Sequence, residues 1–388
     1  MNAGLVKKRL AIAMFVDACG HGVLENRAWF LDELKTRRKV ESLFGYSSAC
    51  VPAILTGRRP NENDHWSAFF YAPKTSPFRV LRPAKALPKF VFDRGRVRAW
   101  LSKGLAKAFG FTGYFQIYCV PFEVLPLFDY AEKKDIFRPG GINRGPSIFD
   151  WLDQERIPHH VSNWRDTEEQ NLHALRDAID GSAIRFAFLY TASLDSLMHD
   201  VTKESSRVDG KLRWYQDEVR ELLRHAAAHY DEVRFALFSD HGMATVTRVV
   251  NLVPNVERTG LSFGEDYAAV YDSTMMRFWF LKPGAEEKIR ASLPDSADGR
   301  WVTEEELKRY GTHWPDGKFG HAVYALESGV LLNPCHMGNV PLKGMHGYRP
   351  DTDDSFSALL ANFEPQTRTA NITDYHALMQ EMARWATG

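Results

Sequence analysis

The chain has 388 residues and a formal net charge of zero at pH 7, so it can bury a large core, and we predict one large domain with insertions. Without an excess of either charge, its composition gives no reason to expect binding to duplex nucleic acid or to a membrane surface. No run of roughly 18 apolar residues occurs, which argues against a membrane span.

Four cysteines are scattered along the chain without a CxxC pair: Cys19, Cys50, Cys119 and Cys335. This distribution is typical of reduced intracellular thiols rather than of a disulfide framework. Near the N-terminus a basic triplet precedes an apolar stretch, as in a signal peptide, but that stretch is only about seven residues long and ends in Asp17. We therefore expect a strand there, and a cytoplasmic protein.

Residues 10–16 form this apolar run, which predicts the first strand. Residues 23–39 carry apolar side chains at helical spacing and predict a helix. Two serines, Ser47 and Ser48, then begin a short apolar helix. Either serine can cap that helix, or it can be a nucleophile placed where N-terminal N–H groups favour an anion. This stretch alone leaves both interpretations open.

Residues 66–130 differ in composition from the rest of the chain. They contain 16 aromatic residues, and ten Lys or Arg against three Asp or Glu, with a helix expected at 97–109. We interpret residues 66–140 as an inserted cap over the core. Its aromatic side chains can form a satellite core, or they can join the basic residues in a rim that recruits an anionic substrate with a flat leaving group.

Beyond the cap, the pattern alternates between strands and helices. We predict strands at 158–161, 184–190 and 235–238, and helices at 145–152, 172–180 and 212–226. This alternation predicts right-handed crossovers and therefore a parallel sheet. In such sheets, functional groups collect beyond the carboxyl ends of the strands.

Acidic and histidine residues follow three of the predicted strands. Asp195 and His199 are four residues apart, so they share one face of a helical turn, and His346 lies near two glycines in a late loop. The full set of candidate ligands is Asp17, Asp195, His199, Asp240, His241 and His346. Carboxylate oxygens and imidazole nitrogens both bind Zn²⁺, at about 2.0–2.2 Å, so this set predicts a divalent metal site.

The C-terminal part contains a hairpin-like pair of strands around 275–281 and a helix that opens with a capping box at Thr303. A strand at 322–332 is expected to return the chain to the core, which ends with a helix at 372–385. The predicted segments are the core at 1–65, the inserted cap at 66–140, the core again at 141–265, a small α+β subdomain at 266–312 and the core return at 313–388.

The order of the candidate residues resembles the alkaline phosphatase superfamily, most closely its type I phosphodiesterase/nucleotide pyrophosphatase branch. That branch shows a nucleophile nine residues before a Thr-Gly pair, an Asp-x-x-x-His, an Asp-His-Gly after a strand and a late His-Gly. Here Ser47 stands nine residues before Thr56 and Gly57. The resemblance covers about residues 8–351 outside the insertion. It implies an α/β fold, with an alkaline phosphatase-like three-layer core and a mostly parallel sheet.

The resemblance also implies a two-metal phosphoric-ester hydrolase, with a phosphodiesterase as the first expectation. One ion would be held by Asp195, His199 and His346, and the other by Asp17, Asp240, His241 and the Ser47 hydroxyl. Two divalent cations about 4 Å apart, Zn²⁺ or alternatively Mn²⁺, would clamp the attacking and leaving oxygens. A phosphoseryl intermediate on Ser47 would split one hard step into two. No organic cofactor is implied, and the expected partner is a small anionic phosphate ester.

Several departures from the branch bear on the substrate. The nucleophile there is Thr, the asparagine that contacts the phosphoryl oxygen has no match at residues 66–70, and Asp17 is followed by Ala-Cys-Gly-His. A phosphomonoesterase or phosphomutase of the same superfamily is therefore an alternative, as is a metal-binding accessory without turnover. Cys50 raises a sulfatase alternative, but the sulfatase cysteine would stand three residues earlier and its Pro-x-Arg is absent.

Overall fold

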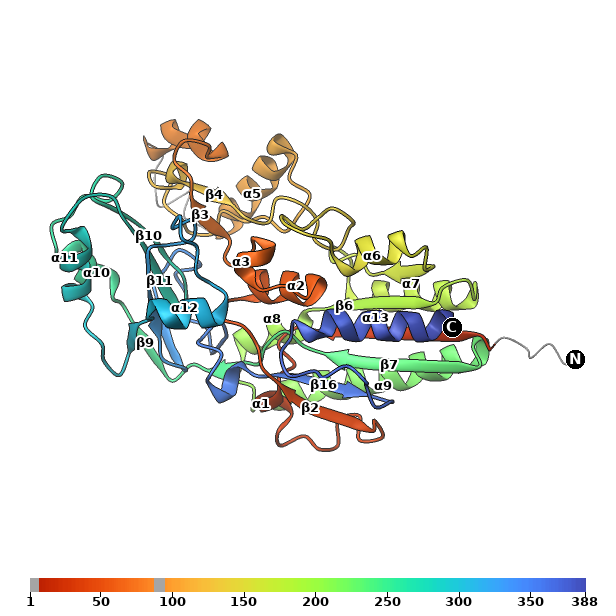
Figure 1. Ribbon diagram of the computed structural model, residues 1–388. Coiled ribbons are helices and arrows are strands. Elements are labelled where there is room, and N and C mark those ends of the chain that lie inside the picture. Colours follow the sequence, from red (N-terminus) through yellow and green to blue (C-terminus); the bar gives the residue numbers. More distant parts are fainter. Residues whose placement is uncertain (1–6, 87–94) are drawn as a thin grey trace, which may run out of the picture.

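The structure, a computed structural model, describes residues 7–86 and 95–388. A six-stranded sheet forms its centre, with strand order β2-β16-β7-β1-β6-β5 (Figure 1). The strands β5, β6, β1 and β7 are parallel, whereas β16 runs antiparallel to both β7 and β2. Their bounds are β1 Arg9–Val16, β2 Thr36–Val40, β5 His159–Val161, β6 Phe186–Thr191, β7 Glu232–Phe238 and β16 Ser357–Ala361. The predicted α/β class with a mostly parallel sheet is confirmed.

Helices cover both faces of this sheet, because alternate residues of each strand point to opposite sides. On one face Ile12 and Met14 belong to the same buried cluster as apolar residues of α7 (Glu168–Asp180) and α9 (Ser206–His229). On the other face Ala13 and Phe15 pack with α2 (Ser47–Thr56), α6 (Ile148–Gln154) and α13 (Asp374–Thr387). The helices predicted at 145–152, 172–180, 212–226 and 372–385 are thus confirmed as α6, α7, α9 and α13.

The predicted helix at 23–39 is wrong. The chain forms only the four-residue helix α1 (His21–Leu24) there, followed by turns and then β2. In β2 Thr36 and Val40 are buried, while Arg37 and Lys39 are exposed. Charged side chains are common on edge strands, where they oppose pairing with another chain. Pairing with β16 at the edge of the sheet outweighs the helical pattern of the sequence.

A second, antiparallel sheet has the order β10-β11-β13-β12. Its strands are β10 (Tyr267–Tyr271), β11 (Met275–Phe280), β12 (Gly299–Trp301) and β13 (Ala322–Leu326), accompanied by α10 (Val253–Glu257), α11 (Ala285–Ser292) and α12 (Glu304–Tyr310). The capping box is confirmed, since Thr303 accepts a hydrogen bond from the backbone N–H of Glu306.

The predicted strand at 322–332 does not return the chain to the central sheet. It is two strands: β13 joins the small sheet, and β14 (Val330–Leu332) pairs with β9 (Arg248–Val250). Two apolar runs are separated by Glu327, Ser328 and Gly329, and the chain turns between them at Gly329, whose φ of +83° favours glycine. The central sheet is rejoined only at β16.

The predicted insertion contains β3 (Phe69–Tyr71), the 3-10 segments η1 (Pro77–Ala86) and η2 (Leu125–Leu127), β4 (Phe128–Tyr130) and α5 (Gly95–Phe109). Its helix at 97–109 is confirmed as part of α5, whereas residues 87–94 lie outside the described residues. Phe69, Phe78 and Phe115 pack with Trp279 of β11 in a separate core. Most of its aromatic residues therefore stabilise the insertion itself, which lies above α2 and α3 (Pro60–Asn63) in Figure 1.

The buried Arg277 on β11 joins the small sheet to this insertion. Its guanidinium donates to Asp272 Oδ2 at 2.9 Å, to the Phe69 and Phe319 carbonyls at 2.9 and 3.1 Å, and to Ser67 Oγ at 2.8 Å. Arg277 and Asp272 are 0% and 1% exposed, so the pair is taken out of water. A buried charge of this kind is stable only while its partner is present.

None of the helices within residues 7–86 and 95–388 is long and apolar enough to cross a membrane. All four cysteines are free thiols. The remaining short elements are α8 (Ser193–Asp200), β8 (Ala244–Thr245), β15 (Gly344–Met345) and η3 (Asp353–Ser355).

Candidate active site

All seven residues singled out in the sequence lie together at the carboxyl edge of the central sheet. Asp17 directly follows β1, Asp240 and His241 follow β7, and α8, which carries Asp195 and His199, follows β6. Ser47 is the first residue of α2, and His346 follows β15. Six of them form two groups, Asp195 with His199 and His346, and Asp17 with Asp240 and His241, and the ligand atoms within each group lie within 4.8 Å of one another.

The group of Asp17, Asp240 and His241 surrounds the Ser47 hydroxyl. Ser47 Oγ lies 3.4 Å from Asp17 Oδ1 and 3.1 Å from His241 Nε2, and that nitrogen lies 3.1 Å from Asp240 Oδ2. Asp240 is held by its other oxygen, which accepts from the backbone N–H of Ala18 and of His241 at 3.3 and 3.0 Å. Oδ1 therefore orients the carboxylate and leaves Oδ2 facing the group.

The tautomer of His241 follows from its second nitrogen. Nδ1 lies 2.9 Å from the Gly242 carbonyl, which can only accept, so Nδ1 carries the proton in that contact. Nε2 then presents its lone pair to the space between Asp17, Asp240 and Ser47. An imidazole oriented in this way through a backbone carbonyl is typical of metal ligands.

The group of Asp195, His199 and His346 is built on the carboxylate of Asp195. Its two oxygens lie 3.4 Å from His199 Nε2 and 3.4 Å from His346 Nε2. His199 Nδ1 lies 2.9 Å from the Gly344 carbonyl, which orients this ring as Gly242 orients His241. A Cβ at Gly344 would lie 2.3 Å from the Met198 carbonyl oxygen, so only glycine lets β15 approach α8 this closely.

The histidine rings connect the two groups. The rings of His241 and His346 stack with centroids 3.9 Å apart and planes at 14°. Burial, and then the nearby His241 and His199, hold the pKa of His346 well below its usual value, so this ring is neutral and can act as a ligand. Burial and the neighbouring carboxylates of Asp240 and Asp195 raise the pKa of Asp17 well above its usual value. These carboxylates therefore oppose one another's ionisation, and a bound cation would offset that repulsion.

The donor set fits two divalent cations. Asp240 Oδ2, Asp195 Oδ1 and His346 Nδ1 are buried atoms without a hydrogen-bond partner among the described residues. An unpartnered buried carboxylate oxygen is costly unless something compensates for it, and a cation does so. Carboxylate and imidazole donors in groups of three match the ligands of catalytic zinc sites, which keep one position open.

A cavity of about 520 Å³ opens over the two groups. Asp17, Ser47, Asp195, His199 and His346 form part of its wall, whereas Asp240 and His241 lie behind them. Aromatic side chains form much of the remaining wall: Tyr46, Tyr114, Tyr118, Tyr130, Phe137, Trp164 and Tyr190. The predicted contact between the insertion and the site is present, through Tyr114, Tyr118, Tyr130 and Glu132.

The predicted basic rim is not present in the cavity wall. Among the residues that the structure describes, no Lys or Arg lines the cavity. Basic side chains of the insertion are used elsewhere, since Arg98 donates to the Val120 carbonyl and its guanidinium lies 4.1 Å from the Phe122 ring. Net composition of a segment does not determine which of its side chains face a cavity.

Glu132 is a cavity residue that the sequence analysis missed. Burial raises the pKa of its carboxyl to about 8, against a smaller lowering by the Tyr114 N–H, which donates to Oε1 at 3.3 Å. At neutral pH this carboxyl is largely protonated and can donate a hydrogen bond into the cavity. It follows β4 in a segment without helical or strand periodicity, so no sequence pattern marks it.

The start of α2 distinguishes the interpretations of Ser47, Ser48 and Cys50. The N-cap of α2 is Tyr46, without a side-chain cap, so the interpretation of the serines as caps is wrong. Ser48 Oγ instead donates to the Trp66 carbonyl at 3.2 Å. Cys50 is fully buried, lies 3.7 Å from Ser42 Oγ, and has a pKa raised by burial. It does not line the cavity, so the geometry gives no support to a sulfatase.

The sequence matches the profile of the type I phosphodiesterase/nucleotide pyrophosphatase family over residues 20–337. The chain belongs to this family. Members of the type I phosphodiesterase/nucleotide pyrophosphatase family are metallohydrolases, which confirms the predicted hydrolase and the predicted resemblance. The matched range includes Ser47, Asp195, His199, Asp240 and His241. Asp17 and His346 lie outside it and join the group through the geometry alone.

Solved structures show the same fold. Murine ectonucleotide pyrophosphatase/phosphodiesterase 5 aligns with a TM-score of 0.67 at 14% identity, over 98% of this chain and 95% of that chain. An inactive variant of the murine protein in complex with AMP gives 0.66 at 15% identity, over 98% and 95%. The human protein gives 0.67 at 12% identity, over 97% and 95%. No curated protein sequence gives a significant match.

Proposed function

We propose that the protein hydrolyses small phosphodiesters through a covalent intermediate on Ser47, assisted by two divalent metal ions. The observation that carries this proposal is the position of the Ser47 hydroxyl. It lies in the cavity wall, 3.4 Å from Asp17 and 3.1 Å from His241, at the N-terminus of the ten-residue helix α2. The backbone N–H groups in the first turn of a helix stabilise an anion, and the phosphoryl group of the substrate is anionic.

The two groups of ligands would each hold one ion. Asp195, His199 and His346 would bind one, and Asp17, Asp240 and His241 would bind the other beside Ser47. When bound, the two ions would lower the pKa of the serine hydroxyl and offset charge on the phosphoryl oxygens. Because three of the six side-chain ligands are imidazoles, we propose Zn²⁺ as the resident metal, with Mn²⁺ as the alternative.

The chain's own residues then divide the reaction into two displacements. Ser47 Oγ bonds to phosphorus while the bond from phosphorus to the leaving ester oxygen breaks, and the leaving group departs as its alcohol or phenol after taking up a proton. Ser47 then carries the phosphoryl group with its other ester substituent. Water attacks that phosphorus, releases a phosphate monoester, and returns a proton to Ser47 Oγ.

The cavity wall supports a diester with a flat substituent. A diester carries one negative charge and a monoester carries up to two, and the described part of the wall offers no Lys or Arg to pair with the second. Tyr114, Tyr118 and Trp164 present aromatic surface that can pack on a flat group. The murine structural neighbour is described in complex with AMP, which is consistent with a nucleoside monophosphate as one product.

The matched pair Ser47→Ala and Ser48→Ala tests the proposed nucleophile. Ser47→Ala should lower kcat for an aryl phosphodiester by several orders of magnitude, with metal content measured so that a lost ligand is not mistaken for a lost nucleophile. Ser48→Ala removes only the hydrogen bond to the Trp66 carbonyl, about 0.5–1.5 kcal/mol of stability, and should leave kcat within a few-fold. The reverse pattern would contradict the assignment.

We also propose a cytoplasmic location, because the four cysteines are free thiols and such thiols persist in reducing compartments. Fractionation of cells that express the natural protein tests this. Recovery with the extracytoplasmic fraction would contradict it.

A further inference from the structure

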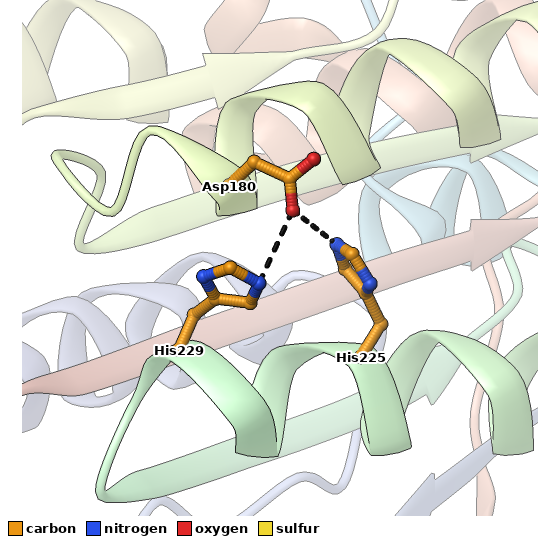
Figure 2. A group of neighbouring side chains, drawn as sticks. All are labelled: Asp180, His225 and His229. Atoms are coloured by element: carbon orange, nitrogen blue, oxygen red, sulfur yellow. Dashed lines mark ion pairs between the residues drawn. The ribbon is translucent and has the colours of Figure 1, made fainter.

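A third group of metal-ligand side chains lies where two neighbouring helices end. Asp180 is the last residue of α7, and His225 and His229 lie one turn apart in the last two turns of α9. Their three ligand atoms lie within 4.8 Å of one another. Figure 2 shows both imidazole rings turned toward the same carboxylate from the neighbouring helix.

The geometry of this group is that of converging ligands. The same oxygen, Asp180 Oδ1, lies 2.8 Å from His225 Nε2 and 3.2 Å from His229 Nε2, and the ring centroids are 5.1 Å apart. Bonds of about 2.0–2.2 Å in a tetrahedral site separate ligand atoms by roughly 3.4 Å. Small side-chain movements would therefore admit an ion between the three atoms.

One of these contacts is poor as a hydrogen bond. His225 Nε2 is buried and has no hydrogen-bond partner among the described residues, although the Asp180 oxygen lies only 2.8 Å away. The distance suits a hydrogen bond, so the direction must be at fault. In a hydrogen bond, donor and acceptor point at each other, whereas metal ligands point at a shared position to one side. The contact with Asp180 therefore leaves His225 Nε2 without a well-directed hydrogen-bond partner, so this nitrogen is available to a metal ion.

The electrostatic setting favours a cation. The partial negative charge of a helix C-terminus stabilises positive charge within its last turn. Two such termini meet here, since α7 ends at Asp180 and α9 ends at His229. The side chains of Asp180, His225 and His229 are 53%, 26% and 31% exposed, so solvent can reach an ion and fill its remaining positions.

We propose that Asp180, His225 and His229 bind a single divalent transition-metal ion, with Zn²⁺ as the expected ion, that ties the end of α7 to the end of α9. Neither helix end lies near the catalytic cavity, and none of the three residues lines it. α7 and α9 lead into the amino ends of β6 and β7, so the length of the sheet, about 20 Å, separates the two sites. The ion acts on stability, and the chemical step does not need it.

Zinc stoichiometry tests the proposal. Wild-type protein is compared with the double variant His225→Ala/His229→Ala after chelation and titration with Zn²⁺ alone. The variant should bind one equivalent fewer, and Zn²⁺ should raise its unfolding temperature by less than that of the wild type. Its kcat/KM should stay within two-fold. Alanine is favourable in helices, so the variant should fold, and Asp180→Asn gives an independent variant that keeps the size of the side chain.

His173→Ala is the matched control, because His173 forms an exposed i,i+4 pair with Asp177 on α7 but has no third ligand in the described part of the chain. It should lose no equivalent. An equal zinc stoichiometry in wild type and double variant would overturn the proposal and leave a simple histidine–carboxylate contact. The difference of one equivalent does not depend on the catalytic centre. If the catalytic centre did not bind metal ions as proposed, the zinc stoichiometry of wild type and double variant would fall equally, and the difference between them would remain.

Discussion

Replacing Glu132 by glutamine removes an ionisable group from the cavity wall while preserving its size. The pKa of this carboxyl rises from 4.5 to about 8 because it is buried. A difference of about 3.5 between the two pKa values, at about 1.36 kcal/mol for each unit, corresponds to roughly 4.8 kcal/mol. Solvent reaches part of this side chain, and screening reduces the expected effect to about 2–4 kcal/mol.

Because the pKa of Glu132 is higher in the folded than in the unfolded protein, this carboxyl lowers the stability of the fold as the pH rises. Below pH 4.5 the carboxyl is protonated in the folded and the unfolded protein, so it has no effect on stability. Between pH 4.5 and 8 it ionises only in the unfolded protein, which destabilises the fold progressively. Above pH 8 the cost is complete. Glu132→Gln should therefore leave stability unchanged near pH 4.5 and increase it by about 2–4 kcal/mol near pH 9.

The assay is urea unfolding at the two pH values in the presence of a chelator, since bound cations would lower the pKa of Glu132. Glu155→Gln, at the exposed end of α6, is the control and should give no pH-dependent difference. In the metal-loaded enzyme, ionised Glu132 would repel an anionic substrate, so kcat/KM should decline at high pH in the wild type and less in Glu132→Gln. An equal stability difference between Glu132→Gln and wild type at both pH values would show that the pKa of Glu132 is not raised in the folded protein.

Three further results are expected. Arg277→Met leaves Asp272 buried without its partner and should cost about 3–5 kcal/mol in urea unfolding, and a loss under about 1 kcal/mol would show that the pair is not isolated from water. Asp240→Asn removes a charged ligand and should lower metal content by about one equivalent and kcat/KM by more than about 100-fold; full occupancy at a normal rate would exclude Asp240 as a ligand. Because no described Lys or Arg lines the cavity, kcat/KM for a diester should change less than about three-fold between low and moderate salt. A steep decline would show that basic side chains of the insertion do recruit the substrate.

The sequence predicted the part of the site that local pattern encodes. Apolar runs ending in Asp17 and in Asp240 mark buried parallel strands, and the carboxyl ends of such strands necessarily meet at one edge. Asp195 and His199 share a helical turn by spacing alone. His346 depends on tertiary structure, because only the packing of β15 against α8 brings it to the others, yet its His-Gly context was sufficient to identify it by resemblance.

Other features have no local signal. The edge strand β2 is predicted as part of a helix because its five residues include three consecutive charged ones, which give no alternation to set against the preceding apolar face. Glu132 and Tyr118 face the cavity because of how irregular segments of the insertion pack, and composition does not determine which way a side chain points. The group at Asp180, His225 and His229 forms only because α7 and α9 lie side by side. Asp180 and His225 are 45 positions apart, and no local sequence pattern predicts a contact over that separation.

Rapid acid quenching during turnover of an aryl phosphodiester tests the central claim most directly. The peptide that contains Ser47 should gain the mass of the phosphoryl group with its retained ester substituent, in step with a burst of released phenol. Fragmentation should place the added mass on Ser47, and Ser47→Ala should show neither the adduct nor the burst. An adduct on Ser48, or a full burst without any covalent adduct, would contradict the proposed mechanism.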